Sequence, residues 1–243
     1  ISIIKEIGNR TFLGKVEKII GHKNDPGVDI LTIAAKHSIE TEFSEEVKRE
    51  LKNIPDEVCE NDLIGRTDLT KEMIFTIDGD DTKDIDDAIS VKRDGKNYVL
   101  GVHIADVSNY VKVGSALYDS AFSRGTSSYL ADTVIPMIPH QLSNGICSLN
   151  PEVIRLTLSC IMTIDSNGKV ISYDIFPSYI KSRKQMTYKN VNKILDKNII
   201  PEGYEEYADT LKLMHELSKI LRQEKINRGY IDFGIDEAKV IQD

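Results

Sequence analysis

Tryptophan is absent from the 243 residues, and cysteine is scarce, with only Cys59, Cys147 and Cys160. Because these three cysteines form no C-x-x-C pair, they exclude a disulfide framework and the common cysteine zinc sites. The five histidines form no H-x-x-x-H or H-E-x-x-H pattern, so they indicate no metal site of that kind. No stretch approaches the roughly 18 to 20 apolar residues that a membrane-spanning helix needs. These absences favour a cytoplasmic protein with reduced thiols and no membrane contact.

The chain also lacks an initiator methionine and the charged and apolar regions of a signal peptide, because it begins Ile1-Ser2-Ile3-Ile4-Lys5. We interpret it as an internal segment of a longer protein. Hydrophobic residues make up 40% of the chain and charged residues 29%, which is enough apolar content to form a core. The length predicts one large domain, or one domain with part of a neighbour.

The net charge of −8 argues against a nucleic-acid partner, but this charge is unevenly distributed. The aspartate-rich segment Thr76–Ala88 holds six aspartates and a single lysine, so it carries more than half of the net charge. No acidic residue lies between Ile175 and Leu195, the stretch that contains the basic strip of Lys181, Arg183, Lys184, Lys189 and Lys193. Tyrosines are interleaved with these cations, so the strip is either a solvated surface or a wall of a nucleic-acid channel.

Alternating apolar residues and turn signals predict an α+β chain. We expect strands at Ile1–Ile7, Lys15–Ile20, Met73–Ile77, Ala88–Val91, Tyr98–Ile104, Leu156–Ile164 and Val170–Phe176. We expect helices at Asp29–His37, Glu45–Leu51, Ser115–Arg124 and Tyr204–Arg228. Gly8–Arg10, Asp94-Gly95 and Asp165–Gly168 are typical of tight turns, and Thr133–Leu149, with its two prolines, is expected to be irregular.

Crowded carboxylates raise one another's pKa and oppose folding unless water or a bound cation compensates them. The aspartate-rich segment follows an apolar strand candidate, and Ile85 between Asp84 and Asp86 is expected to anchor it to the core. Such a segment is embedded in the fold, which favours a cation over a solvated loop. Dense carboxylate oxygens suit Mg²⁺ or Mn²⁺.

Two known loop patterns can be compared with this segment. An EF-hand needs glycine at its sixth position, and the sixth residue counted from Asp78 is Lys83, so that pattern fails. The D-x-D-x-T pattern of haloacid-dehalogenase-type phosphatases is satisfied from Asp78 to Thr82. A phosphatase with Asp78 as nucleophile and Asp80 as acid/base is therefore a second hypothesis.

Several ordered motifs carry a more specific resemblance. The chain resembles the RNB catalytic domain of the ribonuclease II superfamily in the segments Thr76–Ala88, Val102–Ser108, Arg124–Tyr129, Val134–Pro139 and Leu142–Pro151. Residues 70–243 look like the first half of that domain, and residues 41–69 like a connector. Residues 1–40, with Asn24-Asp25-Pro26-Gly27, look like the end of a small OB-fold (cold-shock) β-barrel.

The resemblance implies a processive 3′-to-5′ exoribonuclease that uses Mg²⁺, or Mn²⁺, to release nucleoside 5′-monophosphates from single-stranded RNA. Asp78, Asp84, Asp86 and Asp87 match the four active-site aspartates of the family, and Tyr129 matches an aromatic residue that stacks on the 3′-terminal base. We expect Asp78 and Asp87 to be direct metal ligands, Asp84 to position an ion or its water, and Asp86 to be the most purely catalytic. Asp80 and Asp81 occupy variable positions, so no role is assigned to them.

The family's later Ser-Pro-Ile-Arg motif and S1 RNA-binding domain are absent from these 243 residues. We therefore expect this chain alone to be inactive or nearly so. Separately, we expect the parent protein to be monomeric. A non-catalytic RNA-binding module is the remaining alternative, because a barrel fragment and a basic strip also suit binding without hydrolysis.

Overall fold

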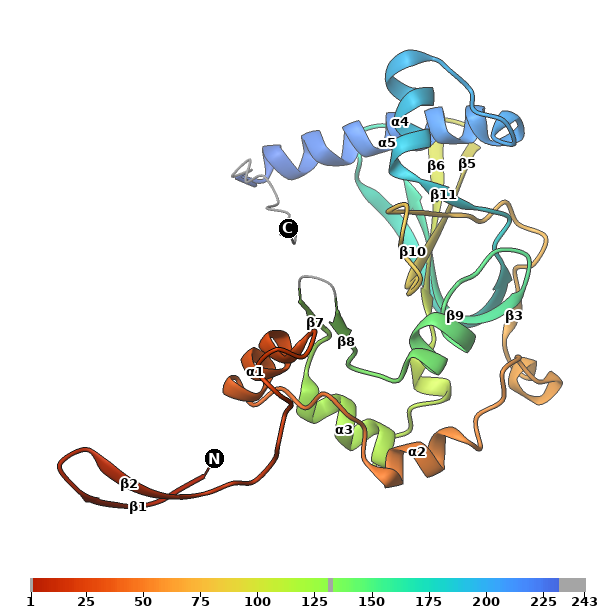
Figure 1. Cartoon of the computed structure of the whole chain (residues 1–243). Helices are drawn as coiled ribbons and strands as arrows, with labels where there is room; N and C mark the ends of the chain where they lie inside the picture. Colours follow the sequence, from red (N-terminus) through yellow and green to blue (C-terminus); the bar gives the residue numbers. More distant parts are fainter. Residues whose placement is uncertain (1, 131–132, 232–243) are drawn as a thin grey trace.

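A five-stranded sheet forms the centre of the computed structural model, which describes residues 2–130 and 133–231. The strand order is β3–β10–β9–β6–β5, and only the short β3 edge pairs in parallel. The strands are β3 (Thr67–Asp68), β5 (Asp87–Asp94), β6 (Asn97–Ala105), β9 (Ile154–Ile164) and β10 (Val170–Lys181). Figure 1 shows these strands between the helices α4 and α5 on one side and α2 and α3 on the other.

Two hairpins that the sequence predicts build most of this sheet. Gly95 adopts a φ of 58° in the turn between β5 and β6, a conformation that glycine adopts without strain. The second hairpin turns between Asp165 and Gly168, where the Asp165 side chain accepts hydrogen bonds from two backbone amides. Both predicted hairpins are confirmed, although β10 continues past the predicted Phe176 to Lys181, because its last part pairs with the start of β9.

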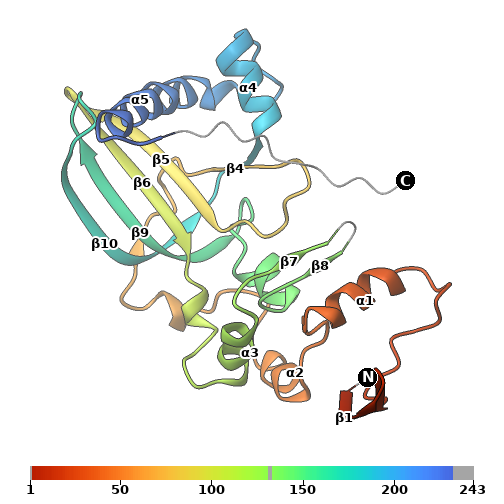
Figure 2. The same cartoon turned by 90° about the vertical axis from the view of Figure 1, so that its left-hand side faces the viewer.

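Helix α5 (Ala208–Asn227) covers one face of the sheet (Figure 2). Leu217 is buried against Val91, Tyr98 and Ile164, and the Tyr98 hydroxyl donates to Glu216 at 2.7 Å. The helix was predicted from Tyr204, but the first residues form a separate 3₁₀ turn before α5 begins.

A second layer contains helix α4 (Tyr188–Lys197) and the parallel pair β4 (Thr76–Asp78) and β11 (Gln185–Thr187). Helix α4 was not predicted. The Thr187 side chain caps it by accepting from the Asn190 amide at 3.3 Å, and its apolar residues pack around Phe75. The basic strip is therefore divided between a strand, a loop and a helix.

Helices α2 (Glu45–Leu51) and α3 (Ala116–Arg124) pack together at the other end of the sheet. Both match their predicted positions, and the side chains of Ser44 and Ser115 cap their N-termini. The prediction that Thr133–Leu149 is irregular is partly wrong. It contains a strand, β8 (Val134–Ile135), and a π-helical turn at Gln141–Ile146 that buries Leu142 and Ile146.

The first residues form a separate hairpin, β1 (Ser2–Gly8) and β2 (Thr11–Lys15), followed by helix α1 (Val28–Lys36). Left-handed Asn9 and Arg10 form the predicted turn. The second strand was predicted at Lys15–Ile20, which is wrong, because β2 follows the turn directly. Figure 1 shows this hairpin apart from the rest of the molecule, and apolar side chains such as Phe12 are exposed.

A polar network crosses the middle of the sheet. The buried His103 ring contacts the Ser159 hydroxyl at 2.7 Å and the Ser90 hydroxyl at 3.2 Å. Ser159 continues to Ser178 at 2.6 Å, and Ser178 contacts Thr157 at 2.7 Å. Burial lowers the pKa of His103 to about 4, so the imidazole is neutral in the folded chain near neutral pH.

Within the part of the chain that the structure describes, none of the helices combines the length and apolar content required to cross a bilayer.

Candidate active site

The aspartate-rich segment joins β4 to β5 along one edge of the molecule. Asp78 ends β4, and Asp87 begins β5. Phe75 and Ile89 form an antiparallel bridge with two backbone hydrogen bonds of 2.9 and 3.1 Å, which holds the ends of the two strands together. Asp78 is thereby directed toward the residues that precede β5.

Ile85 anchors the segment as the sequence predicts. Its side chain is fully buried among apolar residues, and its amide donates to the Ser148 hydroxyl at 3.1 Å. The same hydroxyl donates to the Lys83 carbonyl at 2.8 Å, and the Leu149 amide donates to the Ile85 carbonyl at 2.9 Å. The segment 83–85 is therefore tied to 148–149, and the acidic side chains on both sides of Ile85 are left at the surface.

Ser148 is a residue whose role the sequence did not reveal, although it lies in the motif Leu142–Pro151. We expect Ser148→Ala to lower the free energy of unfolding by about 1 to 3 kcal/mol, because it leaves a buried amide and a carbonyl unpaired. Urea denaturation measures this change. Ser172→Ala, at an exposed position of β10, is the control and should cost less than about 0.5 kcal/mol. Equal stability of the two variants would contradict the anchoring role.

The carboxylates in this segment influence one another. Burial raises the pKa of Asp86, and repulsion from Asp84, Asp87 and Asp78 raises it further, although its side chain remains accessible to water. Burial also raises the pKa of Asp78, with the Thr76 hydroxyl opposing and the charges of Asp87 and Asp84 adding to the effect. The four predicted site aspartates therefore lie within electrostatic reach of one another.

One oxygen in this group is unusual. Asp78 Oδ2 is buried and has no hydrogen-bond partner, and the nearby Thr76 hydroxyl does not reach it with hydrogen-bond geometry. An unpaired buried carboxylate oxygen is costly, and a cation is one partner that would compensate it. The donor set of hard carboxylate oxygens also suits a divalent ion such as Mg²⁺. The residues present therefore fit the predicted ion.

In residues 2–130 and 133–231, however, no three Asp, Glu, His or Cys side chains lie close enough together to hold a metal ion. Direct coordination by Asp78 and Asp87, the positioning role of Asp84 and the catalytic role of Asp86 thus stay predictions. The side chains of Asp86 and Asp87 are exposed, so rotation about their side-chain torsions requires no repacking of the core.

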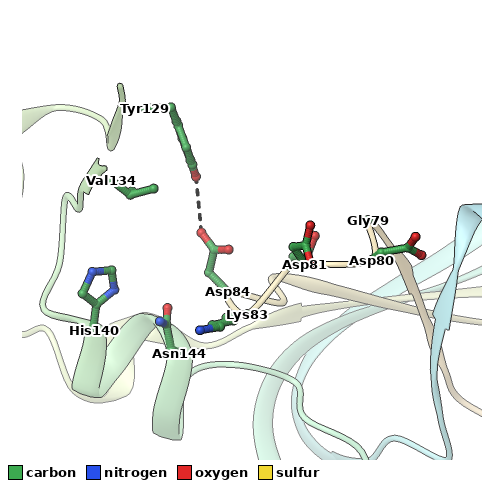
Figure 3. A pocket seen from close by; sticks show the side chains of 10 residues that line it. Gly79, Asp80, Asp81, Lys83, Asp84, Tyr129, Val134, His140 and Asn144 are labelled. Carbon is green, nitrogen blue, oxygen red and sulfur yellow. Dashed lines mark hydrogen bonds between the residues drawn. The ribbon is translucent and has the colours of Figure 1, made fainter. Parts of the chain in front are cut away.

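Tyr129 lies at the other side of the segment. It belongs to the short strand β7 (Ser128–Tyr129), which pairs with β8, and the residue is 69% exposed. The hydroxyl donates to Asp84 Oδ2 at 3.3 Å (Figure 3). Partial burial and the Asp84 charge both raise the pKa of Tyr129, which keeps the phenol protonated and able to donate. Two of the predicted site residues are therefore in direct contact.

A cavity of about 880 Å³ opens between the aspartate-rich segment and the Tyr129 strand. Figure 3 shows Tyr129 and Val134 on one side and the aspartate-rich segment on the other, with His140 and Asn144 projecting from the π-helical turn. Among the described residues, the lining consists of Gly79, Asp80, Asp81, Thr82, Lys83, Asp84, Tyr129, Val134, His140 and Asn144. His140 and Asn144 were not predicted as site residues, although they lie next to or within the quoted motifs. Asp78, Asp86 and Asp87 lie outside this lining.

The basic strip does not line this cavity. Lys181 forms an ion pair with Glu152 at 3.0 Å, and Lys184 lies over the Tyr204 ring at 4.9 Å. The interpretation of the basic strip as a channel wall therefore stays a prediction. Lys83, which does not belong to the strip, lines the cavity.

Comparison with known protein families matches residues 66–243 to the RNB domain and residues 1–44 to a cold shock domain. Ribonuclease R of Thermotoga maritima is 52% identical over 233 residues, which cover 94% of this chain and 33% of that protein. Ribonuclease R 1 of Lactococcus lactis is 48% identical over 235 residues, which cover 96% of this chain and 29% of that protein. The chain thus spans about a third of the length of these curated relatives.

Among solved structures, RNase R of Mycoplasma genitalium in complex with ribose methylated single-stranded RNA matches with a TM-score of 0.87 and 31% identity. The match covers 93% of this chain and 35% of that one. The resemblance predicted from the motifs is confirmed, as is the α+β class with a cold-shock segment in front. The chain belongs to the RNB-domain family and is similar to ribonuclease R.

Proposed function

We propose that this chain supplies the aspartate cluster of a processive, metal-dependent 3′-to-5′ exoribonuclease, a monomeric cytoplasmic enzyme that degrades single-stranded RNA to nucleoside 5′-monophosphates. The observation that carries the proposal is the unpaired buried oxygen of Asp78, whose carboxylate lies within electrostatic reach of Asp84 and Asp87. Asp84 in turn lines the cavity beside Tyr129 and accepts a hydrogen bond from its hydroxyl. Membership of the RNB-domain family supports the same reaction.

Asp78 and Asp87 are the residues that would hold divalent ions, and Asp84 would help to orient them. When bound, Mg²⁺ supplies positive charge for the reacting phosphate oxygens and lowers the pKa of a water molecule. Asp86 would accept the proton of the attacking water, because its raised pKa brings the carboxylate closer to the range in which a general base is effective. One carboxylate oxygen of Asp84 accepts a hydrogen bond from the Tyr129 hydroxyl, so the orientation of the Asp84 side chain is coupled to the position of the Tyr129 ring.

The exposed Tyr129 ring would stack on the 3′-terminal base, since a base can stack on an aromatic side chain regardless of its sequence. Such contacts select single strands without reading base edges. The cavity beside the ring provides room for a nucleotide, and its lining includes hydrogen-bonding groups of His140 and Asn144.

Tyr129→Ala tests this role. We expect KM for single-stranded RNA to rise about 10-fold or more, because stacking contributes roughly 1 to 3 kcal/mol per base. Steady-state kinetics on short oligoribonucleotides measures the effect in a protein that carries this chain together with the remaining length of its relatives. Tyr173→Ala is the matched control, because Tyr173 on β10 is also 69% exposed. An equal effect of both substitutions, or no effect of either, would reject the stacking role.

The reaction itself is tested with 5′-labelled RNA in the same longer protein. The proposal predicts progressive shortening from the 3′ end, release of nucleoside 5′-monophosphates, and complete inhibition by a chelator that Mg²⁺ reverses. The 243-residue chain alone should release little or no product. RNA binding without shortening under any divalent ion would instead indicate a binding module.

That alternative has one observation in its favour. Yeast Ssd1, described as a pseudonuclease, matches the fold with a TM-score of 0.68 and 19% identity over 89% of this chain and 26% of that one. The fold is therefore compatible with the absence of nuclease activity. The phosphatase hypothesis has less support, because Asp80 lines the cavity and the proposed nucleophile Asp78 does not.

A further inference from the structure

The hairpin that carries Tyr129 is short, and its position depends on how its base is held. Strands β7 and β8 pair Ser128 with Ile135 and Tyr129 with Val134, and Leu130 and Thr133 exchange two further backbone hydrogen bonds of 2.8 and 3.3 Å. At the base, the Met137 amide donates to the Ser127 hydroxyl at 3.1 Å. A short two-stranded hairpin gives little rigidity of its own, so contacts at its base contribute to where the Tyr129 ring lies.

Arg124 holds this base from the end of α3, immediately before the hairpin begins. Its Nη1 donates to the Glu40 carbonyl at 2.7 Å and to the Pro136 carbonyl at 3.4 Å. Its Nη2 donates to the Glu42 carbonyl at 2.7 Å, and the guanidinium lies over the Phe43 ring at 4.1 Å from the ring centre. One side chain therefore joins α3, the chain that leaves β8, and the segment Glu40–Phe43.

The acceptors in this arrangement are backbone carbonyls, which have a fixed geometry, unlike exposed carboxylates. A planar guanidinium with several N–H donors fits such a set of acceptors, and a lysine ammonium does not. The segment Glu40–Phe43 lies at the end of the cold shock domain match, residues 1–44. The Arg124 contacts therefore connect the end of that match to the strand that presents Tyr129.

Direct packing between these two parts is incomplete. A cavity of about 280 Å³ lies between them, lined by His37 and Glu40 from one side and by Arg124, Ser128 and Ile135 from the other. Because the lining comes from both sides, the cavity reduces the contact that could otherwise hold the hairpin against the segment. The hydrogen bonds of Arg124 bridge the two parts at the edge of this cavity.

We propose that Arg124 is a positioning residue that fixes Tyr129 against Asp84 by fastening the base of the β7–β8 hairpin to the segment Glu40–Phe43. The effect of Arg124 on RNA degradation rests on the proposed function of Tyr129, whereas its effect on the position of the Tyr129 ring does not.

The absence of tryptophan from the chain allows a direct test. In a Tyr129→Trp background, the introduced indole is the single tryptophan emitter of the 243-residue chain. We expect Arg124→Lys to lower the fluorescence anisotropy of this indole and to increase its quenching by acrylamide, because the ring becomes more mobile. Arg93→Lys is the control, since Arg93 also lies over an aromatic ring, Tyr98, at 4.0 Å. Equal anisotropy in the two lysine variants would overturn the proposal.

A second variant keeps the test decisive if Arg124→Lys does not fold. Phe43→Leu preserves an apolar side chain and removes the ring under the guanidinium, so it should shift the same indole signals in the same direction by a smaller amount. Unchanged indole anisotropy and quenching in a folded Phe43→Leu variant would contradict the fastening. Circular dichroism of each variant establishes that it is folded.

Kinetics separates positioning from general stability. In the longer protein, Arg124→Lys should raise KM for short RNA about 10-fold and change kcat less than about twofold, because ring placement affects binding of the terminal base. A fall in kcat at constant KM would contradict this assignment. If the longer protein releases no mononucleotide, the proposed function fails, and the indole fluorescence measurements still decide the mechanical role of Arg124.

Discussion

Replacement of Asp86 by asparagine should reduce the rate of RNA hydrolysis about 1,000-fold or more and leave RNA affinity within a few-fold of its original value. In the proposed reaction the raised pKa of Asp86 suits its carboxylate to accept a proton, and asparagine cannot accept one. The backbone should be undisturbed, because the Asp86 carbonyl accepts from the Ala105 amide at 2.9 Å independently of the side chain. Single-turnover kinetics with labelled RNA measures the chemical step in the longer protein.

Asp94→Asn is the matched control for this experiment. Asp94 is an exposed residue at the opposite end of the same strand, β5, and the substitution removes the same charge. Its rate should stay within about twofold of the original, because an exposed charge at that distance is screened by salt. A full rate in Asp86→Asn would remove Asp86 from the catalytic machinery, and an equal loss in Asp94→Asn would attribute the effect to net charge.

The second large effect concerns the stability of the sheet. Burial lowers the pKa of His103 to about 4, whereas an unfolded histidine titrates near 6.5. Between these values the unfolded chain binds a proton that the folded chain does not bind. Stability from this group is therefore fully present above about pH 6.5 and is lost as the pH falls through about 4. The free energy of unfolding falls by about 3 kcal/mol over this range.

His103→Gln should remove most of this pH dependence, and it should also lower stability near neutral pH because the hydroxyl network loses its ring. Urea denaturation from neutral pH to about pH 4 measures both effects. The raised pKa values of Asp78 and Asp86 act in the opposite direction, because a carboxyl group whose pKa is higher in the folded chain favours folding when it is protonated. The difference between the variant and the original protein therefore isolates the histidine. His22→Gln, at an exposed position, is the control. Parallel stability curves for all three proteins would contradict the account of His103.

The longer elements of the fold could be predicted because their signals are local. The strands β5, β6 and β9 have apolar runs bounded by turns, and α3 has a serine N-cap and a glycine directly after its end. Helix α4 was missed because its many lysines dominate the composition, and its buried stripe consists of only Val191 and Ile194. The π-helical turn was missed because it lies directly after prolines, which usually indicate irregular structure.

The candidate site also contains some residues that the sequence motifs indicate and others that only the structure reveals. The four aspartates and Tyr129 were identified through motifs, and the structure brings Tyr129 into contact with Asp84. The contacts that hold these residues in place join distant parts of the chain, such as Ser148 to Lys83 and Arg124 to Glu40. A single sequence contains no pattern that reveals partners so far apart, so Ser148 and Arg124 became visible only in the structure.

Diffraction from crystals soaked in Mn²⁺ tests the cation assignment most directly, because anomalous scattering locates the ion without reference to the RNA reaction. The account predicts an anomalous peak in direct contact with the carboxylates of Asp78 and Asp87, at about 2.1 Å from their oxygens. Asp78→Asn should abolish that peak, whereas Asp94→Asn should retain it. Side chains of Asp78, Asp84, Asp86 and Asp87 that remain apart at saturating Mn²⁺, with no ion among them, would contradict it.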